Sequence, residues 1–237
     1  MKALSTINAI LFIICIPLLL ITTNVRFAVN DMRLYEYGFN KYHISEESGL
    51  NKGNLTEIAH ELITYFNSNE EYADISVYNQ RDIAHLKDVK GLIQLVYRLQ
   101  FVALGYIVVY ILFNLLIMGS AFWRDLARRL IWGSWTTIAL LAALGLAAVV
   151  DFDQFFLLFH LVSFRNDFWQ LYPGDKLLLM FPEGFFQDAA LFIAGAAILE
   201  AIIIGAAALY FLKRRGRAKP ESAPLQSNED TQDSLKK

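Results

Sequence analysis

Four long apolar runs dominate the sequence and limit the folds that this chain can adopt. They occupy residues 3–23, 99–122, 130–150 and 189–212, and each is close to the ~20 residues that a helix needs to cross the hydrocarbon core of a bilayer. These runs contain much of the 56% hydrophobic content of the 237-residue chain, which exceeds that of an ordinary soluble domain. The sequence therefore predicts an integral membrane protein that is mainly α-helical, with four transmembrane helices.

The first run shares one feature with a cleaved signal peptide, because Lys2 gives it a basic start. The residues that follow it, Thr22-Thr23-Asn24-Val25-Arg26, lack a small-x-small cleavage site. We therefore expect the first run to be a retained membrane anchor.

Basic residues near the ends of the spans predict the topology, because Lys and Arg in short loops stay on the cytoplasmic side. The loop at 123–129 contains three arginines, and the start of the C-terminal segment is also strongly basic. We expect both to face the cytoplasm, as does the N-terminus, and Arg26 is the exception to this pattern. The segment 213–237 is rich in Pro, Ser, Gln and charged residues and is predicted to be a disordered cytoplasmic tail.

Two segments, 24–98 and 151–188, are left on the outer side of the membrane. The first is predicted to be a small α-rich domain, with one helix that begins near Asn54 or Thr56 and ends at 67–69. A second helix starts near Asp82 and continues into the span at 99–122, with Gly91 as a possible break. The segment 34–42 alternates aromatic and polar residues, which fits either a strand or a surface helix.

The second outer segment is dense in aromatic residues, which is typical of segments that lie at the membrane–water interface. Asp151 or Asp153 is predicted to cap a short helix on which Phe156, His160 and Phe164 share one face. His160 is thereby expected among aromatic rings at the membrane surface. We expect the whole segment to be interfacial.

His160 and His85 are the candidate catalytic residues. His85 lies on the helix that leads into the second span, with Asp88 one turn further on and able to orient its ring. A single histidine at either position would more often be structural. Two histidines on the two outer segments instead favour general acid–base chemistry, because the imidazole pKa lies near neutral pH.

Composition and missing motifs exclude several functional classes. The net charge of −2 leaves no chain-wide basic surface, so no nucleic-acid partner is expected. The sequence contains no Gly-x-Ser-x-Gly elbow, no His-Glu-x-x-His motif, no phosphate-binding glycine loop and no dinucleotide fingerprint. We therefore expect neither a cofactor nor a metal.

Several motifs resemble those of the bacterial lipoprotein intramolecular transacylases, the Lit family. The main one runs from Asp151 to Trp169 with His160 at its centre, and Met180-Phe-Pro-Glu183 follows it. The segments 84–90, around His85, and 35–42 are also similar. The resemblance extends from the first apolar run to the end of the fourth.

This resemblance implies an enzyme that acts on lipoproteins whose N-terminal cysteine carries an S-diacylglyceryl group. The enzyme would move the sn-2 acyl chain onto the α-amino group of the same cysteine and so give the lyso-form lipoprotein. The two functional histidines of the family would correspond to His85 and His160. The implied location is the bacterial cell membrane, with the active site on the extracytoplasmic side and with lipoproteins and membrane lipids as partners.

Such a reaction needs a base for the ammonium proton, an acid for the departing glyceryl oxygen, and donors for the oxyanion. We expect one of the two histidines to be the base, and the other to orient the amine or to protonate the leaving oxygen. Asp88 would fix the ring of His85. The candidate oxyanion donors are Arg165, Asn166 and Tyr172.

Two alternatives remain open on the sequence alone. The first is a metal-dependent membrane hydrolase that uses the two histidines with Asp88 or Glu183 as ligands. The second is a non-enzymatic sensor or scaffold for envelope proteins. Glu200, in the fourth run, also calls for a partner, because an acid inside a membrane helix is costly and is usually paired or functional.

Overall fold

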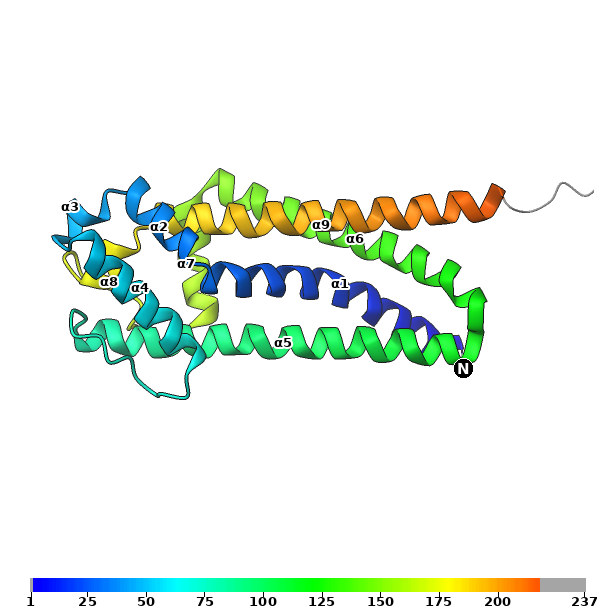
Figure 1. The fold of residues 1–237 in the computed structure, drawn as a ribbon, viewed down its shortest axis with the longest axis horizontal. Helices are drawn as coiled ribbons and strands as arrows, with labels where there is room; N and C mark the ends of the chain where they lie inside the picture. Colours follow the sequence, from blue (N-terminus) through cyan, green and yellow to red (C-terminus); the bar gives the residue numbers. More distant parts are fainter. Residues whose placement is uncertain (1, 218–237) are drawn as a thin grey trace, which may run out of the picture.

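The computed structural model describes residues 2–217, and within this range all regular structure is helical. Figure 1 shows long helices that run along the molecule and a group of short helices at one end. The long helices are α1 (Lys2–Asn30), α5 (Gln80–Met118), α6 (Phe122–Val150) and α9 (Glu183–Arg217). The prediction of a mainly α-helical protein is confirmed.

Three helical stretches of the described chain are long and apolar enough to cross a membrane: Thr6–Asn30, Gln80–Val150 and Glu183–Arg215. The middle stretch contains both α5 and α6, which are joined by the 3-10 turn η1 (Gly119–Ala121). Residues 123–129, expected as a loop, are instead the first turns of α6, because the chain turns earlier, at Gly119. Gly119 has φ +55°, a conformation that glycine adopts without steric cost.

Helix α1 packs against the other three long helices, and small residues let the backbones approach. A Cβ atom on Gly133 of α6 would lie 2.7 Å from the Ile16 side chain of α1. Large apolar side chains such as Leu116 and Val149 remain exposed on the outer faces of the bundle. Since a water-exposed surface of this kind is unfavourable, the outer faces suit a lipid environment.

Glu200 finds a partner inside the bundle. The side-chain amide of Asn24 on α1 donates a hydrogen bond to Glu200 Oε2 on α9, at 2.9 Å. The same amide also donates to the Leu20 carbonyl. The sequence did not indicate this pairing, which joins residues 176 positions apart.

The short helices form a small domain at one end of the bundle, called the outer domain after its predicted side: α2 (Met32–Lys41), α3 (Ile44–Ser48), α4 (Lys52–Asn67) and α8 (Lys176–Met180). The open question at 34–42 is resolved in favour of helix, since this segment lies mostly in α2. Helix α4 begins earlier than expected, because Asn51 is its cap and accepts a hydrogen bond from the Asn54 N–H. Its end at Asn67 agrees with the prediction.

One hydrophobic core unites the two outer segments. Met180 and Phe185 of the second segment are buried together with Tyr35, Phe39 and Leu62 of the first. The contact between α2 and α9 is close. A Cβ on Gly38 would lie 2.3 Å from the Phe185 ring, and Lys41 and Tyr42 both donate hydrogen bonds to the Asp188 carboxylate.

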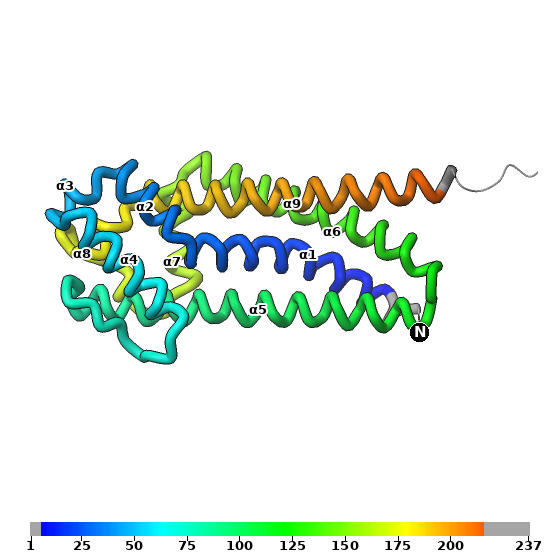
Figure 2. The backbone as a smooth tube through the Cα atoms, viewed as in Figure 1, coloured from blue at the N-terminus to red at the C-terminus, as the bar shows by residue number. Residues whose placement is uncertain are grey.

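Helix α5 continues from the outer domain into the apolar run 99–122 without interruption, as predicted. It begins with a capping box in which the Asn79 side chain accepts from the Asp82 N–H and the Asp82 carboxylate accepts from the Asn79 N–H. The helix continues through Gly91, which was only a possible break, without interruption. Helix α7 (Phe152–Ser163) lies across the outer end of the bundle, and the tube in Figure 2 shows it between α5 and α9. The predicted tail lies outside the described residues from 218 onward, while residues 213–217 belong to α9.

Candidate active site

His85 of α5 and His160 of α7 lie side by side. Their ring centroids are 6.2 Å apart, and each residue is only 8% exposed. His85 belongs to the part of α5 that precedes the apolar run 99–122, so it lies in the outer domain rather than deep in the bundle. The fold therefore brings the two candidate histidines into one buried site.

Aromatic rings surround this pair. The His160 ring lies 4.4 Å from Phe156, 5.0 Å from Trp169 and 5.6 Å from Phe164, measured between centroids. Phe164 also meets the edge of His85, at 5.2 Å. The three rings thus pack together as predicted, but Phe164 lies just beyond the end of α7 at Ser163 rather than on its helical face, and together the rings bury the imidazoles.

The hydrogen bonds of His160 define its tautomer. Its Nδ1 lies 2.8 Å from the Phe156 carbonyl oxygen, which can only accept a hydrogen bond. Nδ1 therefore carries the proton of the neutral ring, and the lone pair is on Nε2. His85 Nδ1 is buried and has no hydrogen-bond partner within the described residues.

Both imidazoles favour the neutral form. Burial lowers the pKa of His85 to about 4; the nearby His160 contributes to this and Asp88 partly opposes it. Burial also lowers the pKa of His160, partly offset by its hydrogen bond to the Phe156 carbonyl. At neutral pH both rings can therefore accept a proton, as a general base must.

A connecting segment, residues 164–175, covers the pair and is called the strap below. Polar side chains of α5 hold it. The Asn166 amide donates to Asp88 Oδ2 at 2.8 Å, and Arg81 donates to the backbone carbonyls of Gln170, at 2.9 Å, and Asp167. The Asn79 amide at the start of α5 donates to Asp175. The strap therefore keeps Trp169 in place over His160.

A family model shows to which family the chain belongs. The model described as lipoprotein intramolecular transacylase Lit matches residues 10–186. The chain belongs to the Lit family. The resemblance inferred from the motifs is confirmed.

Solved structures show the same fold. The Lit of Bacillus cereus has the same fold, with a TM-score of 0.80 and 22% identity, and the match covers 92% of this chain and 100% of the other. Two further structures of that protein, each with one histidine replaced, by arginine or by alanine, match with TM-scores of 0.77 and 21% identity.

Among sequence relatives, a protein of Aquifex aeolicus (strain VF5) described only as uncharacterized is 29% identical over 142 residues. This match covers 59% of the present chain and 61% of the relative, less than two thirds of its length.

The structure assigns some of the predicted Lit site residues to other contacts. The Asp88 carboxylate accepts from Asn166, and no hydrogen bond joins it to His85 within the described residues. Arg165 is exposed, and the exposed Tyr172 ring stacks on Arg81 at 4.9 Å. The roles of Arg165, Asn166 and Tyr172 as oxyanion donors remain predictions.

Asp153 is not the cap of α7. Asp151 is the cap and accepts a hydrogen bond from the Gln154 N–H, and Asp153 lies in the first turn. Burial and the neighbouring Asp153 carboxylate raise the pKa of Glu183. Together these two side chains form a carboxyl pair between α7 and the start of α9.

Neither Arg81 nor the contact of Trp169 with His160 was predicted from the sequence. A signal for Arg81 was available, because Arg81, His85 and Asp88 follow one another at steps of four and three residues and so share one face of α5. Trp169 stood within the Lit motif, but nothing in its spacing indicated which ring it would contact.

The described residues contain no group of three or more His, Cys, Asp or Glu side chains that could hold a metal ion. The metal-hydrolase alternative requires such a group, built from the two histidines with Asp88 or Glu183. This alternative therefore has no ligand set in the part of the chain that the structure describes.

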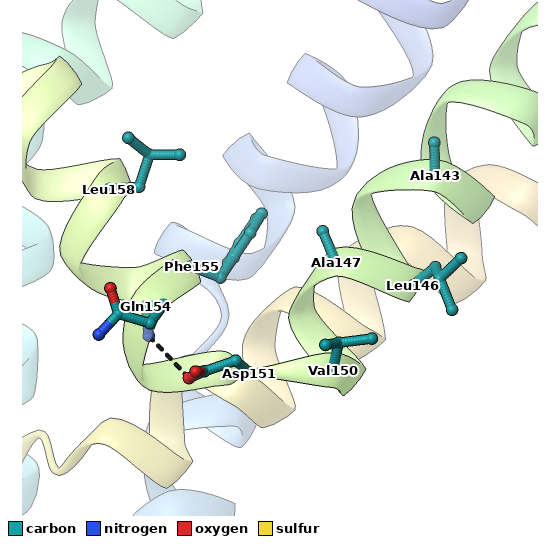
Figure 3. Close-up of a pocket in the computed structure, with 8 residues that line it drawn as sticks. All are labelled: Ala143, Leu146, Ala147, Val150, Asp151, Gln154, Phe155 and Leu158. Carbon is teal, nitrogen blue, oxygen red and sulfur yellow. Dashed lines mark hydrogen bonds between the residues drawn. The ribbon is translucent and has the colours of Figure 1, made fainter.

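An apolar groove of about 470 Å³ lies between the end of α6 and α7. Figure 3 shows Phe155 of α7 near Ala147 of α6, with Leu158 and Ala143 further out on either side and the Asp151 cap where the two helices join. Such a lining suits hydrocarbon, which supports the prediction that α7 lies at the membrane surface.

The lowered histidine pKa values predict how stability depends on pH. The unfolded chain binds a proton at each histidine below a pH of about 6.5, whereas the folded chain resists doing so until the pH approaches about 4 at His85. The free energy of unfolding is therefore highest above pH ~6.5 and falls as the pH drops toward ~4. His85 contributes a decrease of about 3 kcal/mol at most.

The thermal unfolding midpoint in detergent, measured from neutral pH down to about pH 5, tests this dependence. We expect the midpoint to fall in the wild type and to fall less in His85→Asn. His60→Asn, which changes an exposed histidine of α4, is the matched control and should retain the wild-type slope. An unchanged slope in His85→Asn would show that His85 is not held neutral by the fold.

Proposed function

We propose that this protein is a lipoprotein intramolecular transacylase that moves the sn-2 acyl chain of an S-diacylglyceryl cysteine onto the α-amino group of that cysteine. One observation carries the proposal. In a chain of the Lit family, two imidazoles lie in one aromatic site, with ring centroids 6.2 Å apart, at one end of a bundle of apolar helices. Membership of an acyltransferase family and proton-accepting side chains at a lipid surface are what this reaction requires.

The topology belongs to the same proposal. Helices α1, α5, α6 and α9 each cross the bilayer, with the N- and C-terminal ends in the cytoplasm. Arg124 and Arg128 at the start of α6 and Arg215 at the end of α9 support this orientation, because they lie at the end of the bundle opposite the histidines. The active site then faces the extracytoplasmic side, where lipoproteins are anchored.

The chemistry is an exchange of an ester for an amide. The α-amino nitrogen attacks the sn-2 carbonyl carbon and loses a proton, the bond from that carbon to the glyceryl oxygen breaks, and that oxygen gains a proton. Ester and amine belong to one molecule, so their effective concentration is high once the glyceryl group folds back. An amide is more stable than an ester, so the exchange needs no nucleotide.

The two histidines divide the proton transfers in this proposal. His160 Nε2 takes the amine proton, because its Nδ1–H is held by the Phe156 carbonyl. His85, with the strongly lowered pKa, becomes protonated by taking this proton from His160, and as the stronger acid it then returns the proton to the glyceryl oxygen. Arg165, Asn166 and Tyr172 remain the proposed donors to the oxyanion.

Expression in a bacterium that makes only diacylated lipoproteins tests the function. Mass spectrometry of the released N-terminal lipopeptide should show one acyl chain on the α-amino nitrogen and one on the glyceryl group. The amide-linked chain should survive mild alkali, which removes ester-linked chains. A lipopeptide that keeps a free amine and two ester-linked chains, with the protein present in the membrane, would refute the proposal.

A further inference from the structure

A second site lies away from the histidines, where the outer ends of α1 and α5 meet the outer domain. It is a groove of about 640 Å³, and α1, α5, the start of α2 and the end of α4 contribute to its wall. Gln100, in its wall, follows His85 by 15 residues on α5, which corresponds to about 22 Å along a helix. The groove is therefore separate from the proposed catalytic site.

The wall of this groove changes from apolar to polar along its length. Phe101 and Leu104 of α5 line one part, and Asn30, Arg33 and Asn67 line another. The apolar runs 3–23 and 99–122 both end beside it. The groove thus lies at the boundary where the hydrocarbon core gives way to the headgroup layer.

Arg26 lines the groove and is only partly exposed. Its Nη1 donates to Gln100 Oε1 at 3.2 Å, and its guanidinium lies over the rings of Tyr97, at 4.6 Å, and Phe101, at 5.3 Å. No carboxylate pairs with it within residues 6–215. A guanidinium has five donors, so Arg26 can still bind an anion.

The other charges of the groove leave a single positive charge. Arg33 already pairs with Asp31 at 2.6 Å. Two arginines and one aspartate therefore give a local net charge of +1. This balances one phosphodiester, and because Asp31 is already paired, the groove offers little to the ammonium group of a zwitterionic lipid.

We propose that this groove binds one anionic glycerophospholipid, with its phosphate on Arg26 and an acyl chain along Phe101 and Leu104. The apolar half of the groove distinguishes this ligand from a free anion. Such a site also accounts for an arginine on the outer side, where the positive-inside rule disfavours one. The proposal does not depend on the transacylase reaction.

Binding of phosphatidylglycerol to the purified full-length protein in a neutral detergent tests this site, with native mass spectrometry as the readout. Arg26→Gln should weaken binding about tenfold, the loss expected for one charge-assisted contact. The matched control is Arg98→Gln, because Arg98 is an exposed arginine of α5 that does not line the groove. The control should bind phosphatidylglycerol like the wild type.

Two further arms keep the test decisive if Arg26→Gln does not fold. Leu104→Trp fills the apolar half without changing charge, and it should weaken binding comparably. Phosphatidylcholine should bind more weakly than phosphatidylglycerol, and inorganic phosphate should not compete. Equal losses in Arg26→Gln and Arg98→Gln, unchanged binding in Leu104→Trp, or displacement by phosphate would each overturn the proposal.

Discussion

Replacing His160 with alanine is expected to lower formation of the amide-linked product by about 10²- to 10⁴-fold, the contribution that general acid–base residues usually make. The substitution removes the proton-accepting Nε2 of an imidazole that the Phe156 carbonyl and the surrounding aromatic rings hold in place. His85→Ala should cause a loss of the same order. The measurement is the initial rate of lyso-lipoprotein formation by purified enzyme, with the product quantified by mass spectrometry.

The double variant distinguishes a shared proton path from two independent roles. If the proton passes from one imidazole to the other, losing both should cost little more than losing one, because residues that act as a unit are not additive. His60→Ala, at an exposed position on α4, is the control and should keep wild-type activity. Wild-type rates in both single variants would eliminate the histidine mechanism.

Releasing the strap is expected to cost up to about 100-fold in activity, because a displacement near 1 Å in an active site can have that effect. Asp88→Ala and Asn166→Ala each remove the 2.8 Å hydrogen bond between the strap and α5. Both should lower kcat by similar factors, and the double variant should lose no more than either single one. Asp167→Ala, which removes an exposed strap carboxylate, is the matched control.

This cycle also decides what Asp88 does. Similar, non-additive losses would make Asp88 and Asn166 positioning residues that act through the strap. A much larger loss in Asp88→Ala than in Asn166→Ala would instead restore the expectation from sequence that Asp88 acts on the His85 ring. Equal activity in all three variants and the wild type would show that the anchoring of the strap is not needed.

Arg81 lies on the same face of α5 as Asp88 and also holds the strap. It binds the strap through backbone carbonyls of Asp167 and Gln170, so no change of a strap side chain can mimic its loss. Its stacking on Tyr172 adds a second attachment. The strap is therefore attached to α5 at several points. The position of Trp169 over His160 depends on these attachments.

Much of this architecture was predictable because it depends on local sequence. The length and hydropathy of the apolar runs predicted the long helices, and the spacing of Phe156 and His160 predicted their common face on α7, against which Phe164 packs from just beyond the end of the helix. The motifs around His85 and His160 were sufficient to indicate the Lit family. Boundaries were less certain: Asn51 caps α4 and Asp151 caps α7, where neighbouring residues were equally good candidates.

What the sequence alone determined was thus the helical class, the membrane-spanning character and the family, because periodicity and composition act over a few turns of chain. Only the tertiary structure decided which side chains meet. It placed His85 against His160, gave Asp88 to Asn166 and Glu200 to Asn24, and merged two outer segments into one core. These contacts join residues more than 70 positions apart, and their geometry follows from how α5, α7 and α9 pack, which no local pattern encodes.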